Sequence, residues 1–314
     1  MQQFKEIIAP VERSLIEEEL RNNKFIRKTN FGNNEIYIIT AHDSPNTMRE
    51  IGRLREFTFR KAGGGTGKEI DIDEYDTMPE PYKQLIVWNP IDKEIIGGYR
   101  YIVGDKIVKD EHGNFMLATN HMFKFSERFI KDFLPYTIEL GRSFVQPQYQ
   151  PMNDNRKGIF AMDNIWDGLG AVIIENPKMK YFFGKMTMYL NYNVKARDMI
   201  MYFLERYFPN KEKLVETYHP RKIETDIKEL DSLFCGKDYK ENYRILVQNV
   251  RFLKENIPPL VNTYMNISPS MHTFGAALND SFGEVEEIGI LVTINDIYDI
   301  KKERHLHSYH KTKK

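Results

Sequence analysis

The sequence predicts a mixed α/β (α+β) fold in which a mainly antiparallel sheet is flanked by helices. Two strand-like segments, residues 83–88 and 94–103, are separated only by the turn Asn89-Pro90-Ile91-Asp92-Lys93, and this spacing predicts an antiparallel hairpin. Helical periodicity occurs on both sides of the hairpin, most clearly over residues 194–208. No internal repeat or low-complexity linker interrupts this order, so we expect a globular domain and not a repeat array.

The elements expected in the first half are bounded by recognisable start and stop signals. They are a helix over residues 11–21, a strand over 35–40, a helix ending near 60, a glycine-rich break over 62–67 and a strand over 137–145. Asn46 or Thr47 is the expected N-cap of the helix that ends near residue 60. Together with the hairpin, these segments supply most of the predicted sheet.

The second half is richer in helix and charge. Its expected elements are a polar loop over 146–157, a helix over 159–175, a strand over 180–188, a helix over 194–208 and a final strand over 288–294. Residues 209–258 are charged and mostly helical, and Pro258-Pro259 ends them. We therefore predict one domain over residues 1–314 with a helical insertion at about 209–258.

Composition restricts the function. The chain has 45 basic and 45 acidic side chains, so it carries no net field for nucleic acid. No apolar run approaches the roughly 20 residues needed to span a bilayer, and no secretion signal opens the chain. The single cysteine, Cys235, fits a reducing compartment and is expected to be a small buried side chain, not a nucleophile. We expect a cytoplasmic protein, with peripheral contact to the inner membrane as the alternative.

The segment Glu139-Leu-Gly-Arg-Ser-Phe-Val145 places an acid, a glycine and an arginine inside a strand that otherwise reads as buried. Charged residues are rarely buried without a partner. Gly141 suggests a β-bulge, or a position where a ligand approaches the backbone closely. Two interpretations of Glu139 stay open: a structural ion pair, or a catalytic carboxylate.

Two further segments carry charge in unusual places. Asp71-Ile-Asp-Glu-Tyr-Asp76 is either a solvated acidic turn or a site for a cationic amine, and its spacing departs from a calcium loop. Gly97-Gly98 precede Arg100 in a strand, which indicates that something packs closely on this backbone. Arg100 is the expected partner of Glu139 or Asp73. The histidines are scattered, so no metal site is predicted.

The glycine-rich segment 62–68 is not predicted to be a phosphate-binding P-loop. Ala62 stands where that motif requires its first glycine, and Glu69 stands where it requires Ser or Thr. A mobile loop that becomes ordered over a substrate is the preferred interpretation.

Four motifs in order give the chain a family resemblance: Arg55-Glu-Phe-Thr-Phe59, Asp73-Glu-Tyr-Asp76, Gly97-Gly-Tyr-Arg100 and Glu139-Leu-Gly-Arg142. The set resembles the acyl-homoserine-lactone synthases and the related "hemolysin-like" N-acyltransferases of ornithine-lipid and glycine-lipid synthesis, all members of the GNAT superfamily. Ile165-Trp-Asp-Gly-Leu169, Tyr181-Phe-Phe-Gly184 and Ile257-Pro-Pro-Leu260 favour the lipid-synthesis branch. The resemblance extends over roughly residues 50–300.

This resemblance implies a GNAT-like fold and transfer of a fatty acyl or 3-hydroxyacyl group from an acyl carrier protein thioester to the α-amine of glycine or ornithine. It implies no cofactor beyond the acyl thioester. The catalytic candidates are Glu139, Arg142, Asp73, Asp76 and Arg100. The substrate-binding candidates are Arg55, Phe59, Gly141, Ser143, Phe144, Arg156, Lys157, Gly158 and Trp166. Glu139 is the candidate base, and Asp73 and Asp76 are candidates for positioning the ammonium.

The chain departs from the family pattern in two places. The tryptophan expected shortly after Phe59 is replaced by glycines, which argues against a synthase-type amine pocket. Arg156-Lys-Gly-Ile-Phe-Ala161 has the elements of a GNAT pyrophosphate loop in the wrong spacing, which favours acyl carrier protein over acyl-CoA as the donor. A lactone-type signal synthase and a non-catalytic acyl- or lipid-binding protein on the same fold stay as alternatives.

The implied partners are acyl carrier protein, the amino-acid acceptor and an O-acyltransferase that completes the lipid. The basic residues proposed to meet the carrier protein are Lys124, Arg128, Lys131, Arg156 and Lys157, with a solvated face as the alternative. The residues proposed to line an acyl tunnel are Phe144, Trp166, Phe182, Phe183 and Met186, with ordinary core packing as the alternative.

Overall fold

The computed structural model describes residues 4–21, 24–150, 156–306 and 308–309. The chain divides into two compact units. Unit 1 comprises Met1–Ala118, Pro135–Lys180 and Asp299–Lys314, and unit 2 comprises Thr119–Leu134 and Tyr181–Tyr298. The expectation of a single domain with an insertion stays a prediction. Within the described residues, no helix is both long and apolar enough to cross a membrane.

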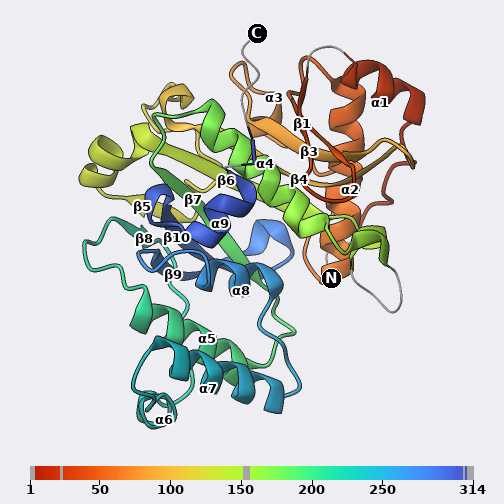
Figure 1. Cartoon of the computed structure of the whole chain (residues 1–314). Helices are drawn as coiled ribbons and strands as arrows, with labels where there is room; N and C mark the ends of the chain where they lie inside the picture. Colours follow the sequence, from red (N-terminus) through yellow and green to blue (C-terminus); the bar gives the residue numbers. More distant parts are fainter. Residues whose placement is uncertain (1–3, 22–23, 151–155, 307, 310–314) are drawn as a thin grey trace. The chain divides into compact units, whose positions relative to one another are not determined.

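Unit 1 is built on strands that run in the order β1-β2-β3-β4-β6 (Figure 1). They are β1 (Phe25–Lys28), β2 (Glu35–Ile39), β3 (Lys83–Asn89), β4 (Glu94–Val103) and β6 (Thr137–Val145). Each neighbouring pair is antiparallel. The predicted hairpin is confirmed, because β3 and β4 pair directly across the turn. The predicted α/β class, mainly antiparallel with helices against the sheet, is confirmed as well.

Two helices cover opposite faces of this sheet. The helices of unit 1 are α1 (Arg13–Leu20), α2 (Pro45–Ala62), α3 (Glu74–Thr77), α4 (Ala161–Glu175) and α9 (Asp299–His305). Gln84 of β3 bonds to Arg55 of α2, whereas the adjacent Leu85 lies against Gly168 of α4. Successive side chains of a strand point to opposite faces, so α2 and α4 lie on different sides of β3.

Helix α2 begins earlier than the sequence indicated. Its N-cap is Ser44 and not Asn46 or Thr47, because Pro45 occupies the first turn with a preset φ. The Ser44 side chain does not cap the helix. Instead the Glu19 carboxylate of α1 accepts hydrogen bonds from the backbone N–H groups of Asn46 (2.9 Å) and Thr47 (2.7 Å). A carboxylate from another helix thus performs the capping that local sequence rules assign to a neighbour.

The glycine pair in β4 is explained by its neighbouring strands. A Cβ at Gly97 would lie 2.3 Å from the carbonyl oxygen of Phe144 in β6, and one at Gly98 would lie 2.3 Å from that of Leu85 in β3. Both distances are far below van der Waals contact. The predicted close packing on this backbone is therefore confirmed, and its cause is the two flanking strands.

Unit 2 contains a three-stranded antiparallel arrangement, β7-β10-β9, and a separate antiparallel pair, β5-β8. Its strands are β5 (Phe123–Phe125), β7 (Tyr181–Met188), β8 (Val215–Thr217), β9 (His272–Asn279) and β10 (Val285–Thr293). Its helices are α5 (Val194–Tyr207), α6 (Ile227–Leu233), α7 (Tyr239–Phe252) and α8 (Pro259–Met265). Helix α5 packs against α7 and β9.

Two strands were missed in part or in full because they contain buried charged residues. β10 begins at Val285, earlier than predicted, because Glu286 and Glu287 are buried in the strand although charges usually mark its outside. β1, with buried Arg27, and β9 were not predicted.

Cys235 is exposed, so the expectation that it is buried was wrong; Phe234 beside it takes the core position.

Candidate active site

The acidic segment 71–76 is folded against α2 and is not a solvated turn. Asp71 donates its backbone N–H to the Gly52 carbonyl of α2 (3.1 Å). Asp73 is the N-cap of α3, where its carboxylate accepts from the backbone of Tyr75 (3.1 Å) and Asp76 (3.3 Å). The Asp76 carboxylate in turn accepts a hydrogen bond from the Asp73 backbone N–H (3.2 Å), which completes a capping box. Asp71 and Asp76 are consequently buried.

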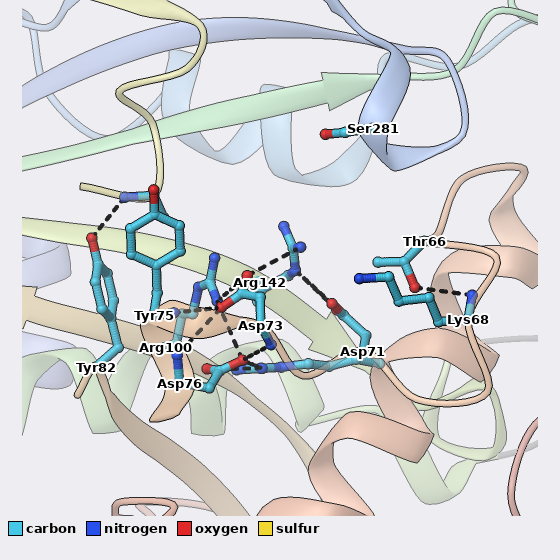
Figure 2. Close-up of polar contacts among 12 residues, drawn as sticks. Thr66, Lys68, Asp71, Asp73, Tyr75, Asp76, Tyr82, Arg100, Arg142 and Ser281 are labelled. Atoms are coloured by element: carbon cyan, nitrogen blue, oxygen red, sulfur yellow. Dashed lines mark hydrogen bonds and ion pairs between the residues drawn. The ribbon is translucent and has the colours of Figure 1, made fainter. Parts of the chain in front are cut away.

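Three arginines from three elements meet these acids, and Figure 2 labels two of them, Arg100 and Arg142. Arg55 of α2 lies 3.2 Å from Asp76 and also donates to Gln84. Arg100 of β4 donates to both oxygens of Asp73 at 2.7 Å and lies 3.3 Å from Asp76. Arg142 of β6 is the third and contacts Asp71 and Asp73. We call these six residues the Arg–Asp cluster: Arg55, Arg100, Arg142, Asp71, Asp73 and Asp76.

Arg142 is placed by a β-bulge. Gly98 pairs with Phe144, but Arg100 pairs with Gly141, so β6 contributes one residue more than β4 over this stretch. Arg142 takes up the difference with φ +49°, a backbone conformation that is uncommon for a residue with a side chain. Its guanidinium then lies between Asp71 (2.9 Å) and Asp73 (3.6 Å). The bulge predicted at Gly141 is confirmed.

Glu139 is buried two residues before Gly141, and its carboxylate accepts a hydrogen bond from the Tyr82 hydroxyl. Tyr82 is itself fully buried and its oxygen accepts from the Ala118 backbone N–H at 3.0 Å. The Arg100 guanidinium lies over the Tyr82 ring, 5.3 Å from the centroid. Two acids, Glu139 and Asp73, were expected as partners of Arg100. Asp73 is a direct partner, because Arg100 donates to both of its carboxylate oxygens. Whether Glu139 acts as a base stays a prediction.

The pKa of Asp76 is lowered in this region, whereas the pKa of Tyr82 is raised. Burial raises the pKa of Asp76, but the positive charges of Arg55 and Arg100 outweigh it and hold the pKa at about 2. Burial, the Glu139 charge and the hydrogen bond to Glu139 raise the pKa of Tyr82 well above its usual value. Asp76 is thus a fixed anion and Tyr82 a fixed hydrogen-bond donor at neutral pH.

The remaining predicted residues of unit 1 occupy mixed environments. Phe59 lies one turn after Arg55 on α2 and is buried, as is Phe144 of β6. Ser143 of β6 and Trp166 of α4 are half-buried, and the Trp166 ring lies 6.3 Å from that of His305. The substrate-binding roles of these residues stay predictions.

The segment predicted to resemble a pyrophosphate loop is folded onto the residues before it. Gly158 lies in the short 3₁₀ turn η5 (Arg156–Gly158), and a Cβ there would be 1.7 Å from the Tyr149 carbonyl oxygen. Lys157 pairs with Asp92 (2.8 Å) and Glu94 (3.5 Å), so its charge is matched locally. The Arg156 side chain falls outside what the structure describes.

The other residues proposed for the carrier protein and the acyl chain belong to unit 2. Of the basic group, Lys124, Arg128 and Lys131 are exposed, and Arg128 pairs with Glu212 at 2.7 Å. Of the acyl-tunnel group, Phe182, Phe183 and Met186 are buried in β7. Phe183 packs among the rings of Phe123, Phe125 and Phe129. These contacts fit ordinary core packing.

The glycine-rich segment after α2 binds an anion from its own helix. The buried Glu56 carboxylate accepts hydrogen bonds from the backbone of Thr66 (3.0 Å) and Gly67 (2.8 Å) and from the Thr66 hydroxyl (2.7 Å). Arg60 completes the arrangement with a 2.7 Å contact to Glu56. A carboxylate is thus the anion that these backbone amides bind, and the exclusion of a P-loop stays a prediction. The loop is bonded to α2, which does not support the expected mobile lid.

Sequence reasoning missed Tyr82, Gln84 and the pairing of Asp71 with Arg142. The available signal was the polar Gln84 within the apolar segment Tyr82–Trp88. No group of three or more His, Cys, Asp or Glu side chains capable of holding a metal occurs among the described residues.

Residues 54–154 match the family described as an acetyltransferase (GNAT) domain. A glycine N(alpha)-acyltransferase of Phocaeicola vulgatus is 57% identical over 306 residues, covering 98% of this chain and 94% of that protein. One of Bacteroides thetaiotaomicron is 55% identical over 306 residues, covering 98% and 91%. A solved CoA-dependent acyl-homoserine lactone synthase aligns with a TM-score of 0.36 and 10% identity over 86% of this chain and 89% of that one. The GNAT match spans the whole Arg–Asp cluster together with Glu139.

Proposed function

The chain belongs to the family of the glycine N(alpha)-acyltransferases, which are GNAT N-acyltransferases, and on that premise we propose that it transfers a fatty acyl or 3-hydroxyacyl group from a thioester to the α-amine of glycine. The observation that carries this proposal is the 57% identity to a glycine N(alpha)-acyltransferase over 98% of the chain. Glycine thereby replaces the choice between glycine and ornithine that the sequence left open.

Aminolysis of a thioester requires a neutral amine, and the α-amine of glycine is mostly protonated at neutral pH. Glu139 is the proposed base: its carboxylate accepts the ammonium proton, directly or through a water molecule. The amine nitrogen then forms a bond to the carbonyl carbon, the C–S bond breaks, and the thiolate leaves with the proton that Glu139 held. The carboxylate, ionised again, takes the second proton from the nitrogen as the amide forms and releases it to solvent. The Tyr82 hydroxyl fixes the orientation of this carboxylate.

The Arg–Asp cluster supports the acceptor side of this reaction. Asp76 is fully buried between Arg55 and Arg100, so its role is to position them. Asp73 is the carboxylate of the cluster that reaches the surface, with 26% of its side chain exposed. Of the two acids expected to hold the ammonium, Asp73 is therefore the better candidate. The backbone N–H groups at the bulge of β6 are candidates for binding the thioester oxygen.

We further propose acyl carrier protein as the carrier of the acyl group. GNAT enzymes that use CoA need free backbone amides for its pyrophosphate. Gly158 is packed on the Tyr149 carbonyl and the 62–67 loop binds Glu56, so neither glycine-containing segment supports such a site. The 3-hydroxyl of the product N-acylglycine would be the substrate of an O-acyltransferase, as expected for lipid synthesis.

The test is direct transfer by the purified protein. It is incubated with isotopically labelled glycine and with the same acyl chain on acyl carrier protein or on CoA, and the products are identified by mass spectrometry. We expect labelled N-acylglycine, formed faster from the carrier-protein thioester, and little product with ornithine. Absence of N-acylglycine with both donors would refute the proposed function, whereas faster use of CoA would refute only the donor.

A further inference from the structure

One carboxylate and one guanidinium of the Arg–Asp cluster reach the surface together. The side chains of Asp73 and Arg142 are 26% and 15% exposed, whereas Asp71 and Asp76 are buried beneath them. Asp71 fixes the Nε side of Arg142 at 2.9 Å, and Asp73 lies 3.6 Å from Nη2 of the same guanidinium. The exposed edge of the cluster thus presents opposite charges side by side (Figure 2).

A buried donor in the same cluster lacks an acceptor. Arg100 Nε is inaccessible to solvent and has no hydrogen-bond partner among the described residues. A buried N–H without an acceptor is costly and rare, so such a group needs an explanation. A Cβ at Gly141 would lie 3.5 Å from this Nε, so the missing side chain at Gly141 leaves space next to the donor. An oxygen atom of a ligand placed beside Gly141 would accept a hydrogen bond from Arg100 Nε.

We propose that this edge is the acceptor subsite and that it recognises a free α-amino acid through both of its charges. The α-carboxylate pairs with Arg142 beside Gly141, and the ammonium pairs with Asp73 until Glu139 removes its proton. The inference rests on the proposed function and adds the element of the site that selects the acceptor. Its chemical class is a small zwitterion that bears a carboxylate next to the reacting amine.

Charge balance favours this class over ligands of a single charge. The cluster contains three guanidinium and three carboxylate groups, which cancel. It therefore provides no net field for a fatty acid. A guanidinium offers planar paired donors that fit a carboxylate, and such charge-assisted bonds are the strong ones. The bulge that turns Arg142 to φ +49° fixes this fork in place.

The first experiment uses the unaltered protein, so it does not depend on any variant folding. Initial rates are measured with glycine, with glycinamide and with methylamine, at saturating acyl thioester and with each amine corrected for its neutral fraction. We expect kcat/KM for glycine to exceed that for glycinamide by about 10- to 100-fold, the range for loss of a charge-assisted hydrogen bond. Equal kcat/KM for the two would overturn the subsite while leaving the proposed function intact. Acylation of none of them would overturn the proposed function itself.

The second experiment locates the discrimination. Arg142→Gln should raise KM for glycine about 10- to 100-fold more than it raises KM for glycinamide, so that the preference disappears. Arg53→Gln is the matched control, because Arg53 is 16% exposed and is paired with Glu50 on α2. An equal loss with both acceptors in Arg142→Gln would contradict carboxylate recognition.

A third variant fills the space without breaking an ion pair. The contact that a Cβ would make at Gly141 is an ordinary one, so Gly141→Ala should fold with an unchanged melting temperature. It should raise KM for glycine by several-fold while changing KM for the acyl thioester little. An unchanged KM for glycine in the folded variant would show that no acceptor oxygen approaches Gly141.

Discussion

Each unit of this protein buries a network of opposite charges, and the two networks differ in how completely they are satisfied. In unit 2, Arg197 of α5 contacts Asp198 (2.6 Å), Glu224 (3.0 Å) and Glu286 of β10 (3.1 Å). Glu286 also pairs with Arg221 at 2.7 Å. This network joins the helical segment to the strands beside it, and no buried side-chain atom of its described members lacks a partner.

The Arg–Asp cluster of unit 1 is different. It contains a residue with positive φ, Arg142, and buried donors without acceptors at Arg55 Nε and Arg100 Nε. Natural structures satisfy buried polar groups, and exceptions concentrate where a ligand or a reaction needs them. The comparison teaches that buried charge alone does not identify a site. A buried hydrogen-bond donor without an acceptor, next to a residue with a strained backbone, is the more selective signal.

The sharpest test of this contrast is Glu139→Gln. The amide keeps an acceptor for the Tyr82 hydroxyl but removes the base, so we expect kcat to fall by about 10²- to 10⁴-fold. The melting temperature should stay within a few degrees of the parent value. Rate measurements beside thermal unfolding check both statements. A variant that retains most of its activity would leave Glu139 with a structural role only.

Glu286→Gln in unit 2 should show the reverse behaviour. It leaves Arg197 and Arg221 without their shared buried anion, and breaking such a pair costs about 3–5 kcal/mol of unfolding free energy. Molecules that remain folded should keep their kcat. Urea unfolding followed by fluorescence measures the loss. A change in kcat without a change in stability would show that the two networks do not divide structure and function as we infer.

The Arg–Asp cluster should also make stability depend on pH in a narrow acid range. Asp76 has a folded-state pKa of about 2, below its ordinary value of 3.8, so it binds its proton more weakly in the folded state. Its contribution is present above about pH 4 and is lost as pH falls toward 2, by about 2–3 kcal/mol. Urea unfolding at several pH values tests this, with Asp76→Asn as the comparison. An equal slope in both proteins would argue against the assigned pKa.

The smallest expected effect separates Tyr82 from a packing residue. Its O–H donates to Glu139 and orients the carboxylate proposed as the base, so Tyr82→Phe should lower the whole pH profile of kcat/KM by about 10-fold. Tyr101→Phe, another buried tyrosine of the same sheet, is the control and should leave the profile in place.

The parts of the site that sequence could predict are those where a charge interrupts an apolar strand. Glu139 and Arg142 around Gly141 predicted the bulge, and Arg100 after Gly97-Gly98 predicted an acidic partner, Glu139 or Asp73. Pairings between distant segments could not be predicted this way. Arg142 meets Asp71, and Glu139 meets Tyr82, because the sheet and α2 bring these segments together and no local spacing records it.

The fold shows the same limit. Hairpin β3–β4 and strand β6 follow from apolar runs and a turn, and their predicted bounds hold to within one residue. The start of β10 was missed because Glu286 and Glu287 look like loop residues until their partners are known. The N-cap of α2 was misplaced because Glu19 of another helix performs the capping. Tertiary contacts override local rules wherever a charge finds a distant counter-ion.

The glycine-rich turn after α2 carries its own lesson for recognising proteins by motif. The Glu56 carboxylate accepts hydrogen bonds from backbone amides of the kind that bind nucleotide phosphates in other proteins. A motif that scores only the glycines would wrongly assign this chain to the nucleotide-hydrolysing enzymes. Glu56, about two helical turns before Gly63, shows that the backbone amides of this turn already bind an anion.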